Sequence, residues 1–212
     1  MPPALILASG SRYRKDLLAR LRIPFEVRVP DVDETPLSGE TPLAMATRLA
    51  RVKAAAVAVL VPDAWVLGAD QVAVCRDRII GKPGESARAI EQLTNASGQT
   101  VHFFTAVCLS RRRDGQCEQH VDETRVRIRV LSPAEISRYV ELDRPFDCAG
   151  SFRAEGLGIT LLERIDSTDP TALIGLPLIW LSGALRRAGF PAGALKVGRA
   201  PPSGHRRAAR SP

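Results

Sequence analysis

The first half of the chain alternates short apolar runs with stretches of helical periodicity. Ala4–Ala8 is continuously apolar, which is typical of a strand buried on both faces. The small residues of Ser9–Ser11 follow it and precede leucines that recur at helical spacing. A strand, a small-residue turn and a helix in this order present backbone N–H groups to an anion. Further on, Thr41 followed by Pro42 predicts a helix start with the threonine as N-cap.

The middle of the chain contains two long alternating runs. They flank Asp114-Gly115, a dipeptide that favours a tight hairpin turn. Over residues 125–130 of the second run, arginines alternate with apolar residues, which predicts a half-exposed strand with a solvated face. The tetrapeptide Ser132–Glu135 has the pattern of a capping box with proline at the first helical position, so a helix should begin there.

Strands that alternate with helices early and pair as hairpins later predict an α/β fold with a mixed sheet. We expect strands at Ala4–Ala8, Phe25–Val29, Trp65–Ala69, Val72–Val74, Arg78–Ile80, Val101–Leu109, His120–Val130 and Ile159–Arg164. We expect helices after Ser11, from Thr41 to about Leu60, at Ser86–Thr94, from Pro133 to about Leu142 and at Leu178–Ala188. Pro30–Glu40 is expected to be a polar loop.

Composition narrows the class of protein. The chain has 212 residues, 45% hydrophobic and 25% charged, which is ordinary for a globular protein. Its longest apolar runs, Ala54–Val61 and Leu173–Leu181, fall short of the ~20 residues that a membrane-spanning helix needs. We find no secretory signal pattern at the N-terminus and no Cys-x-x-Cys spacing among the four cysteines. We therefore expect a cytoplasmic protein with reduced thiols and no membrane contact.

The net charge of +7 is concentrated near the C-terminus. Four of the 30 basic residues and none of the 23 acidic ones lie in Arg199–Pro212, so the remainder carries +3. We expect residues 1–196 to form a single domain and residues 197–212 to form a disordered basic tail. A mild positive balance suits an anionic small molecule and gives little support to a nucleic-acid partner.

Four charged residues stand out by position. Arg14 lies in the first predicted turn after Ser11, where the helix dipole favours an anion and a guanidinium can grip phosphate. Lys53 lies in line with the apolar residues of its helix, so its ammonium must snorkel, pair with an acid or point into a cavity. Asp70 ends a predicted buried strand, where α/β folds place ligand-binding groups. Lys82 lies in a tight turn after a strand.

Each of these residues has an ordinary alternative role. The arginine and the turn lysine could be solvated, the helical lysine could snorkel, and the aspartate could cap a helix or a turn. Together with the acids Asp31, Asp33 and Glu34, however, they form a set of cations and carboxylates. Because cations cradle phosphates and carboxylates hold a hard divalent ion, this set indicates phosphate chemistry on a nucleotide.

Nine stretches, in order and spread over nearly 180 residues, match one family pattern. They are Leu5–Ser11 with Arg14 and Leu17-Leu18, Asp31–Thr35, Arg48–Ala50 with Lys53-Ala54, Gly68–Val72, Gly81–Pro83, Ser97-Gly98 with His102, Asp147–Phe152, Glu155–Gly158 and Ile174–Leu178. On these stretches the chain resembles the Maf family of nucleoside triphosphate pyrophosphatases. The resemblance leaves out only the tail after about residue 196.

The resemblance implies a Maf/inosine-triphosphatase-like α/β fold, with a mixed twisted sheet, flanking helices and a cleft between two lobes. Residues 1–196 would be its single Maf-like catalytic domain. It also implies metal-dependent cleavage between the α- and β-phosphates, giving a nucleoside monophosphate and pyrophosphate. Asp70 would activate water and share a divalent cation (Mg²⁺, Mn²⁺ or Co²⁺) with Glu34. The triphosphate would be bound by Ser9, Arg14, Lys53 and Lys82.

Three further positions of the resemblance concern the base: Tyr13, Gln71 and Glu155. The branch acting on dTTP and UTP typically has Arg, Thr and Gln there, whereas the branch hydrolysing 7-methyl-GTP has an aromatic residue, Gln and Glu. An aromatic face attracts the positive charge of 7-methylguanine by about 0.5–2 kcal/mol. A carboxylate can accept from the guanine N1–H and amino groups. The alternative is a packed tyrosine and a solvated glutamate.

We therefore expect an enzyme that converts 7-methyl-GTP to 7-methyl-GMP and pyrophosphate, clearing modified nucleotides from the pool, with a link to cell-division arrest. Three alternatives stay open: a pyrophosphatase for dTTP, UTP or CTP, a non-catalytic nucleotide-binding regulator of septum formation, and a nucleic-acid-binding protein led by the tail. The expected partner is a small-molecule nucleotide, and a homodimer is compatible with the sequence. Where the family often has Ser-Pro-Arg-Arg, this chain has Arg12 in place of the proline, which could add a cation.

Overall fold

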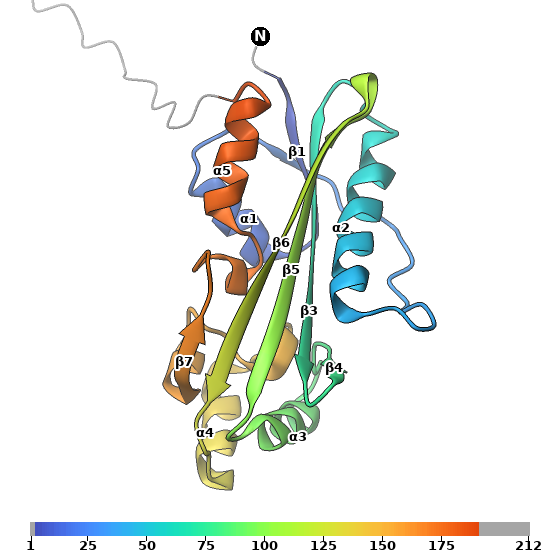
Figure 1. Cartoon of the computed structure of the whole chain (residues 1–212). Helices are drawn as coiled ribbons and strands as arrows, with labels where there is room; N and C mark the ends of the chain where they lie inside the picture. The colour runs from blue at the N-terminus through green and yellow to red at the C-terminus, as the bar shows by residue number, and fades with distance from the viewer. Residues whose placement is uncertain (1–2, 191–212) are drawn as a thin grey trace, which may run out of the picture.

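The computed structural model describes residues 3–190, which form one seven-stranded mixed sheet with helices packed against it (Figure 1). The strand order is β2-β1-β3-β5-β6-β7, and β4 pairs with β3. The strands are β1 (Leu5–Ala8), β2 (Glu26–Val27), β3 (Trp65–Cys75), β4 (Arg78–Ile80), β5 (Thr100–Arg111), β6 (Gln116–Ile128) and β7 (Leu162–Asp166). The helices are α1 (Arg12–Ala19), α2 (Pro42–Ala58), α3 (Ser86–Ala96), α4 (Pro133–Asp143) and α5 (Leu178–Arg187). The predicted α/β fold with a mixed sheet is confirmed.

Local signals in the sequence explain most helix starts and turns. Thr41 caps α2 by accepting from the Ala44 amide, and the capping box at the start of α4 is complete. β5 and β6 are joined through a short 3₁₀ turn and the left-handed Gly115, as the Asp-Gly signal predicts. The arginines of the second long strand are exposed, which confirms the solvated face.

Several predicted strands differ in extent. The two long hairpin strands, β5 and β6, begin earlier than predicted, and β6 ends two residues earlier. The segment Phe25–Val29 has only two strand residues, because β1, the strand it pairs with, is itself only four residues long. The start of Ile159–Arg164 belongs to a 3₁₀ helix, Leu157–Leu161, in which the Thr160 hydroxyl donates to the Leu157 carbonyl at 2.7 Å. β7 therefore begins later than the alternating pattern predicted.

The predicted strand end at Asp70 is wrong, because β3 continues unbroken to Cys75. β1 pairs with β3 only as far as Gly68, and β4 joins the same edge of β3 from Ala73 onward. Asp70 therefore lies beside a gap in strand pairing, just past the carboxyl end of β1. The ligand-binding position typical of α/β sheets is present, but the end of the neighbouring strand creates it.

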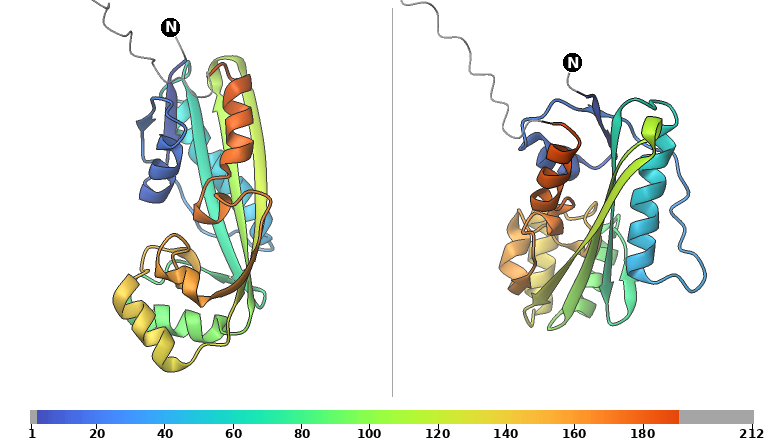
Figure 2. Two further views of the ribbon diagram at one scale, coloured as in Figure 1. Left: turned by 90° about the vertical axis from the view of Figure 1, so that its left-hand side faces the viewer. Right: turned by 45° about the horizontal axis from the view of Figure 1, so that its top comes forward.

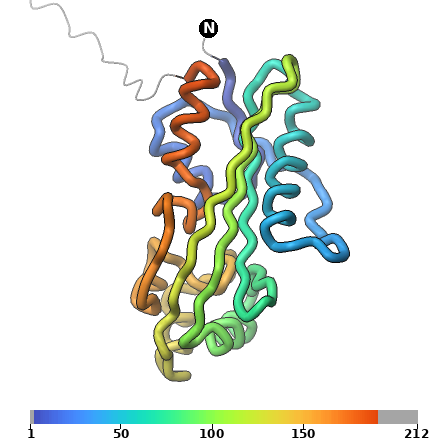
Figure 3. Tube along the Cα trace, viewed as in Figure 1, coloured from blue at the N-terminus to red at the C-terminus, as the bar shows by residue number. Residues whose placement is uncertain are grey.

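Helices cover both faces of the sheet. α2 packs on one face through a cluster of buried alanines and valines, and α1 and α5 pack on the other through leucines. A separate cluster of buried residues lies under α3 and α4. Figure 2 shows α1 and α5 toward one end of the molecule and α3 and α4 toward the other. The long antiparallel pair β5 and β6 runs through both ends and joins the two lobes (Figure 3).

Gly68 allows α2 to lie close to β3. A Cβ atom at this position would lie 2.2 Å from the Ala50 carbonyl oxygen and 2.9 Å from the Ala54 Cβ. The facing side of α2 is itself built from small residues, since Ala46, Ala50 and Ala54 are all buried. This close approach sets the height of α2 above the sheet, and with it the position of Lys53.

We expect Gly68→Ala to lower the free energy of unfolding by about 1–3 kcal/mol, because α2 must move away from β3 to admit the methyl group. Urea unfolding followed by circular dichroism measures the change. Gly183→Ala on α5 is the matched control, since its Cβ would meet only the flexible Arg187 side chain at 3.4 Å. The control should be neutral or slightly stabilising. Equal stability of the two variants would contradict close packing of α2 on β3.

Other predictions concern the end of the domain, contact with membranes and the state of the cysteines. The expected domain end at residue 196 and the basic tail at 197–212 lie outside the described residues. Within residues 3–190, no helix combines the length and the apolar character needed to cross a membrane. Cys75, Cys108, Cys117 and Cys148 are all free thiols, as predicted.

Candidate active site

Two adjoining pockets form a groove along the gap in strand pairing. The first, which we call the Tyr13 pocket, has a volume of about 330 Å³ and lies between the start of α1 and the segment Asp147–Glu155. The second, the Asp70 pocket, has a volume of about 550 Å³ and lies between the end of β1, α2 and the loop before it. α1 packs in the buried cluster that it shares with α5, whereas Phe152, within the segment Asp147–Glu155, packs in the cluster under α3 and α4. The groove therefore lies between the two lobes, and the predicted cleft is present.

The structure brings all nine predicted site residues into this groove. Ser9, Glu34, Lys53 and Asp70 line the Asp70 pocket, Tyr13 and Glu155 line the Tyr13 pocket, and Arg14, Gln71 and Lys82 line both. These three residues, together with Gly10, Ser11 and Ala149, line both pockets and make them one continuous groove.

Alternation along β3 sends neighbouring residues to opposite faces of the sheet. Asp70 faces α2, as Gly68 does, whereas Gln71 faces the 3₁₀ helix Ala172–Ile174. The side-chain nitrogen of Gln71 donates to the Thr105 hydroxyl at 2.9 Å and to the carbonyls of residues 172 and 173 at 3.1 and 3.0 Å. These bonds turn the amide nitrogen into the protein, so the carbonyl oxygen is the group that remains for a ligand.

Lys53 forms ion pairs with both predicted metal-binding acids. Its Nζ lies 2.7 Å from Asp70 Oδ1 and 2.8 Å from Glu34 Oε1. Lys53 is only 6% exposed and Asp70 only 7%. Of the three roles that the sequence left open for Lys53, pairing with an acid is confirmed and snorkelling is wrong.

The loop that carries Glu34 is tied to α2. Arg48 donates through Nε and a terminal nitrogen to the two carboxylate oxygens of Glu40, at 2.6 and 2.7 Å. The same guanidinium donates to the Thr35 carbonyl at 3.1 Å. Asp33 accepts from the Thr35 amide at 2.9 Å, and hydrogen bonds from Thr35 lower the pKa of Asp33. These contacts hold the residues on both sides of Glu34 in place.

Arg14 is enclosed between α1 and the chain before α5. Its Nε donates to the Gly175 carbonyl at 3.2 Å, and a terminal nitrogen donates to Ser9 Oγ at 3.4 Å. Gly175 has φ 131°, and a Cβ there would lie 3.2 Å from Arg14 Cγ, so the glycine permits this approach. Burial lowers the pKa of Arg14, and the charges of Asp70 and Glu34 oppose that shift. The alternative of a solvated surface arginine is wrong.

The Tyr13 hydroxyl is the centre of a small polar cluster. It accepts from Arg12 at 2.7 Å and donates to Asp147 Oδ1 at 3.1 Å, and it lies 3.3 Å from Cys148 Sγ. The Arg12 guanidinium lies 4.7 Å from the centroid of the tyrosine ring and pairs with Asp147 at 3.2 Å. Burial raises the pKa of Tyr13 to about 12, so the hydroxyl is protonated at neutral pH. The charge of Arg12 is therefore committed to Asp147.

Charge is distributed unevenly along the groove. In the Tyr13 pocket, Arg12 and Arg153 are each paired with an aspartate, whereas Glu155 has no ion pair within residues 3–190. Arg14 and Lys82, where the two pockets join, have none either in this part of the chain. The groove thus offers unpaired positive charge beside Asp70 and an unpaired carboxylate at its far end.

The donor set beside Lys53 suits a hard divalent cation. Two carboxylates, from Glu34 and Asp70, approach the same ammonium from different elements. Mg²⁺ is commonly bound by one or two carboxylates completed by substrate phosphates and water. No cluster of three or more His, Cys, Asp or Glu side chains able to hold a metal occurs among the described residues. A metal here would therefore take its remaining ligands from a phosphate and from water.

Several residues that line the groove or support it were not singled out from the sequence. Arg48 and Asp147 lie inside stretches that match the family pattern, so the pattern itself could have identified them. Arg153 follows directly after such a stretch. Asp143, which pairs with Arg153, lies at the end of α4 and carries no signal in the sequence.

An α/β sheet whose groove combines unpaired cations with carboxylates at the end of a strand defines a class of proteins that bind phosphate compounds. The family described as Maf-like protein matches residues 4–188. A relative from Cupriavidus metallidurans is 56% identical over 189 residues, which cover 89% of this chain and 95% of the relative. One from Xanthomonas oryzae pv. oryzae is 56% identical over 191 residues, covering 90% and 98%.

A third relative, from Nitrosococcus oceani, is 49% identical over 190 residues, covering 90% of this chain and 96% of its own. All three relatives are named 7-methyl-GTP pyrophosphatase. The chain described here belongs to the Maf family.

Proposed function

We propose that this protein is a nucleoside triphosphate pyrophosphatase that hydrolyses 7-methyl-GTP to 7-methyl-GMP and pyrophosphate, acting on the nucleotide pool of the cytoplasm. The observation that carries this proposal is the single groove that joins Asp70 and its neighbouring cations to a pocket with Tyr13 and an unpaired Glu155. Relatives 49–56% identical to the chain bear the name of this activity.

The triphosphate is placed in the Asp70 pocket. Arg14 and Lys82 carry unpaired positive charge where the two pockets join, so they neutralise the phosphate oxygens. Ser9 Oγ and the amides of Arg12 and Tyr13 contribute hydrogen bonds, whereas the third first-turn amide, that of Arg14, is already capped by Ser11. Glu34 and Asp70 would hold a divalent cation, which when bound would further neutralise charge on the phosphates.

Asp70 is the proton acceptor in this mechanism. Its carboxylate takes a proton from a water molecule, whose oxygen forms a bond to the α-phosphorus. The bond between the α-phosphorus and the α,β-bridging oxygen breaks, and its electrons leave on pyrophosphate. Positive side chains that are already in place stabilise this departing charge without reorganisation. Lys53 holds the Asp70 carboxylate in position through its 2.7 Å ion pair.

The base is placed in the Tyr13 pocket. The tyrosine ring offers an aromatic face to the cationic purine, a contact of about 0.5–2 kcal/mol. The unpaired Glu155 carboxylate accepts from N1–H and the exocyclic amine, and its charge favours the methylated base over neutral guanine. The hydrogen bonds of Tyr13 with Arg12 and Asp147 hold the ring in position.

A panel of triphosphates tests the proposal. The wild-type protein is incubated with a divalent metal and with 7-methyl-GTP, GTP, dTTP, UTP or CTP, and pyrophosphate and orthophosphate are measured separately. We expect pyrophosphate, with the highest kcat/KM on 7-methyl-GTP. Orthophosphate alone would overturn the reaction, and a preference for pyrimidines would support the other family branch. Tight binding without turnover would support a non-catalytic regulator.

Glu155→Gln should weaken the preference for the methylated base. Loss of one charge-assisted hydrogen bond is expected to lower kcat/KM for 7-methyl-GTP by about 10–100-fold, with a smaller decrease for GTP. Steady-state kinetics on the two substrates measure the ratio. Glu163→Gln on β7 is the matched control, because that side chain is 60% exposed and lies outside the groove. An equal decrease on both substrates would contradict a role in sensing the charge of the base.

A further inference from the structure

We propose that Arg153 is an additional specificity-determining residue, which donates a hydrogen bond to the oxygen at position 6 of the bound guanine-type base. This inference rests on the proposed function. It names an atom of the base that Arg153 recognises in addition to the groups recognised by Glu155. Arg153 lines the Tyr13 pocket together with Glu155, two residues further along the chain.

The backbone of Arg153 is fixed from two sides. Its amide donates to the Tyr139 hydroxyl at 2.9 Å. A Cβ atom on Gly158 would lie 2.5 Å from the Arg153 carbonyl oxygen, so only glycine permits that packing. Gly156 plays the same part for the side chain, because a Cβ there would lie 2.5 Å from Arg153 Nε. Gly156 therefore leaves the space that the guanidinium occupies beside this turn.

Asp143 holds one end of this guanidinium and balances its charge. A terminal nitrogen of Arg153 donates to Asp143 Oδ1, and the Asp143 side chain is 2% exposed. The second oxygen of Asp143 has no hydrogen-bond partner within residues 3–190. The pair is therefore neutral as a whole, so Arg153 can donate to a cationic base without adding net repulsion.

The guanidinium retains donors for the pocket. It carries five N–H groups in a planar fork, of which Asp143 engages one terminal nitrogen. The Arg153 side chain is 30% exposed, in contrast to its buried partner. Arg14 and Lys82, where the two pockets join, are assigned to the triphosphate. Of the other side-chain nitrogen donors in this pocket, Arg12 is engaged with the Tyr13 hydroxyl and Asp147, and the Gln71 amide with the protein interior.

A single turn carries both the Glu155 carboxylate, which is the acceptor, and the Arg153 guanidinium, which is the donor. The amide of Gly156 donates to the Arg153 carbonyl at 3.0 Å, which closes a turn that also contains Glu155. Guanine has matching groups on adjacent atoms, since O6 is an acceptor beside the N1–H donor. Methylation of N7 removes the other acceptor on that side of the base, so O6 is the acceptor that remains. In this arrangement Glu155 accepts from N1–H and Arg153 donates to O6, so the two residues together recognise this edge of the base.

The test compares 7-methyl-GTP with its 6-thio analogue, which keeps N1–H and the amino group but replaces O6 with a weak acceptor. The wild-type protein is expected to prefer the 6-oxo substrate by about fivefold or more in kcat/KM. Arg153→Met removes the donor and should bring this ratio close to one. Arg153→Lys keeps the ion pair with Asp143 but lacks the second donor of the fork, so it should lose most of the preference while remaining folded.

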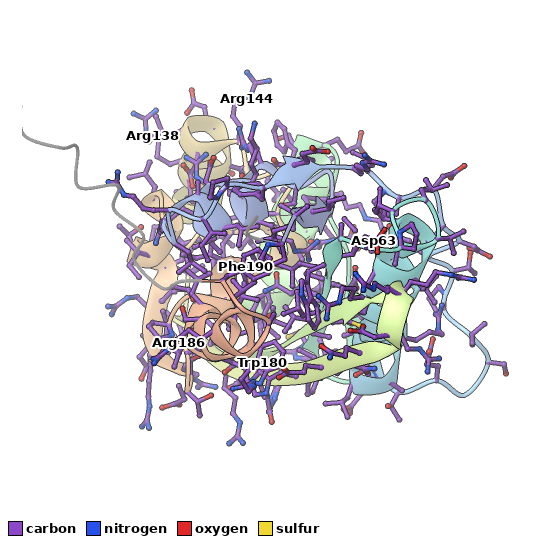
Figure 4. The ribbon with its side chains drawn as sticks, turned by 90° about the horizontal axis from the view of Figure 1, so that it is seen from above. Asp63, Arg138, Arg144, Trp180, Arg186 and Phe190 are labelled. Carbon is purple, nitrogen blue, oxygen red and sulfur yellow. The ribbon has the colours of Figure 1, made fainter. Side chains whose placement is uncertain are left out.

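Arg138→Met is the matched control. Arg138 also pairs with an acid, Glu141 at 3.0 Å, but it lies on the outer side of α4 and is 66% exposed (Figure 4). The ratio of kcat/KM between the 6-oxo and 6-thio substrates should be the same in this variant as in the wild type. Thermal melting of each variant identifies any that fail to fold, in which case Arg153→Lys decides the question.

The outcomes separate the two proposals. If Arg153→Met and Arg153→Lys lower kcat/KM for both substrates by the same factor, Arg153 has only a structural role and the inference is overturned. If Arg153→Lys keeps the full wild-type preference, the forked donor is not needed and the inference is likewise overturned. A wild-type protein that does not hydrolyse 7-methyl-GTP overturns the proposed function, and this inference with it.

Discussion

Asp70→Asn is expected to lower kcat for pyrophosphate release from 7-methyl-GTP by about 10²–10⁴-fold, the range typical of a lost general base. The amide has nearly the same shape as the carboxylate but cannot take a proton from water. Arg14 and Lys82 carry the charge that binds the triphosphate, so the affinity for substrate should change far less than kcat. Single-turnover kinetics and calorimetry with a non-hydrolysable α,β-methylene analogue measure the two quantities separately.

Asp63→Asn is the control for this substitution. Asp63 is 79% exposed and lies in the loop between α2 and β3 (Figure 4). It is not among the residues that line the groove, so its loss should change neither kcat nor affinity. Full activity in Asp70→Asn would overturn the assignment of Asp70 as proton acceptor. Loss of binding in proportion to loss of kcat would instead assign Asp70 to substrate binding.

Fold class was predictable because its signals are local. The apolar run at Leu5–Ala8, the N-cap at Thr41 and the capping box at Ser132 each specify an element through nearby residues. The course of β3 was not predictable in this way. A charged residue inside an apolar run normally ends a buried strand, and only the shortness of β1 leaves room beside Asp70 for its carboxylate.

The sequence was enough to predict which residues form the site, but not which of their side chains form ion pairs. Spacing places Lys53 on the apolar side of α2, but the identity of its partners depends on how closely α2 approaches β3. That approach is set by Gly68, whose role becomes clear only when Ala50 is seen against it. The pairing of Arg153 with Asp143 likewise joins two segments whose contact no local pattern encodes.

The alternation of side chains along β3 places two residues of the site on opposite faces of the sheet. Asp70 and Gln71 are neighbours in sequence, yet their side chains leave the sheet on opposite faces. One meets Lys53 beneath α2, and the other meets Thr105 and the turn before α5. A groove that passes the open edge of this strand therefore meets the acid in the Asp70 pocket and the amide where the two pockets join. The strand itself separates the place for phosphate chemistry from the place for base recognition.

Lys53→Met is expected to lower both stability and activity. Without the ammonium, the carboxylates of Asp70 and Glu34 face each other uncompensated. We expect a loss of about 2 kcal/mol in the free energy of unfolding, less than the ~3–5 kcal/mol typical of a fully buried pair, because the Glu34 side chain is 58% exposed. The misplaced Asp70 should reduce kcat/KM for 7-methyl-GTP by about 10²-fold or more. Urea unfolding and steady-state kinetics measure the two effects.

A double-mutant cycle shows whether charge is the cause. In Lys53→Met/Asp70→Asn the uncompensated buried carboxylate is gone, so stability should recover toward that of the wild type, with a coupling of about 1–2 kcal/mol. Activity should not recover, because the proton acceptor is absent. Lys15→Met, on the exposed side of α1, is the matched control and should leave stability unchanged. Strictly additive losses would contradict the ion pair as the source of the effect and would assign Lys53 a packing role through its aliphatic chain.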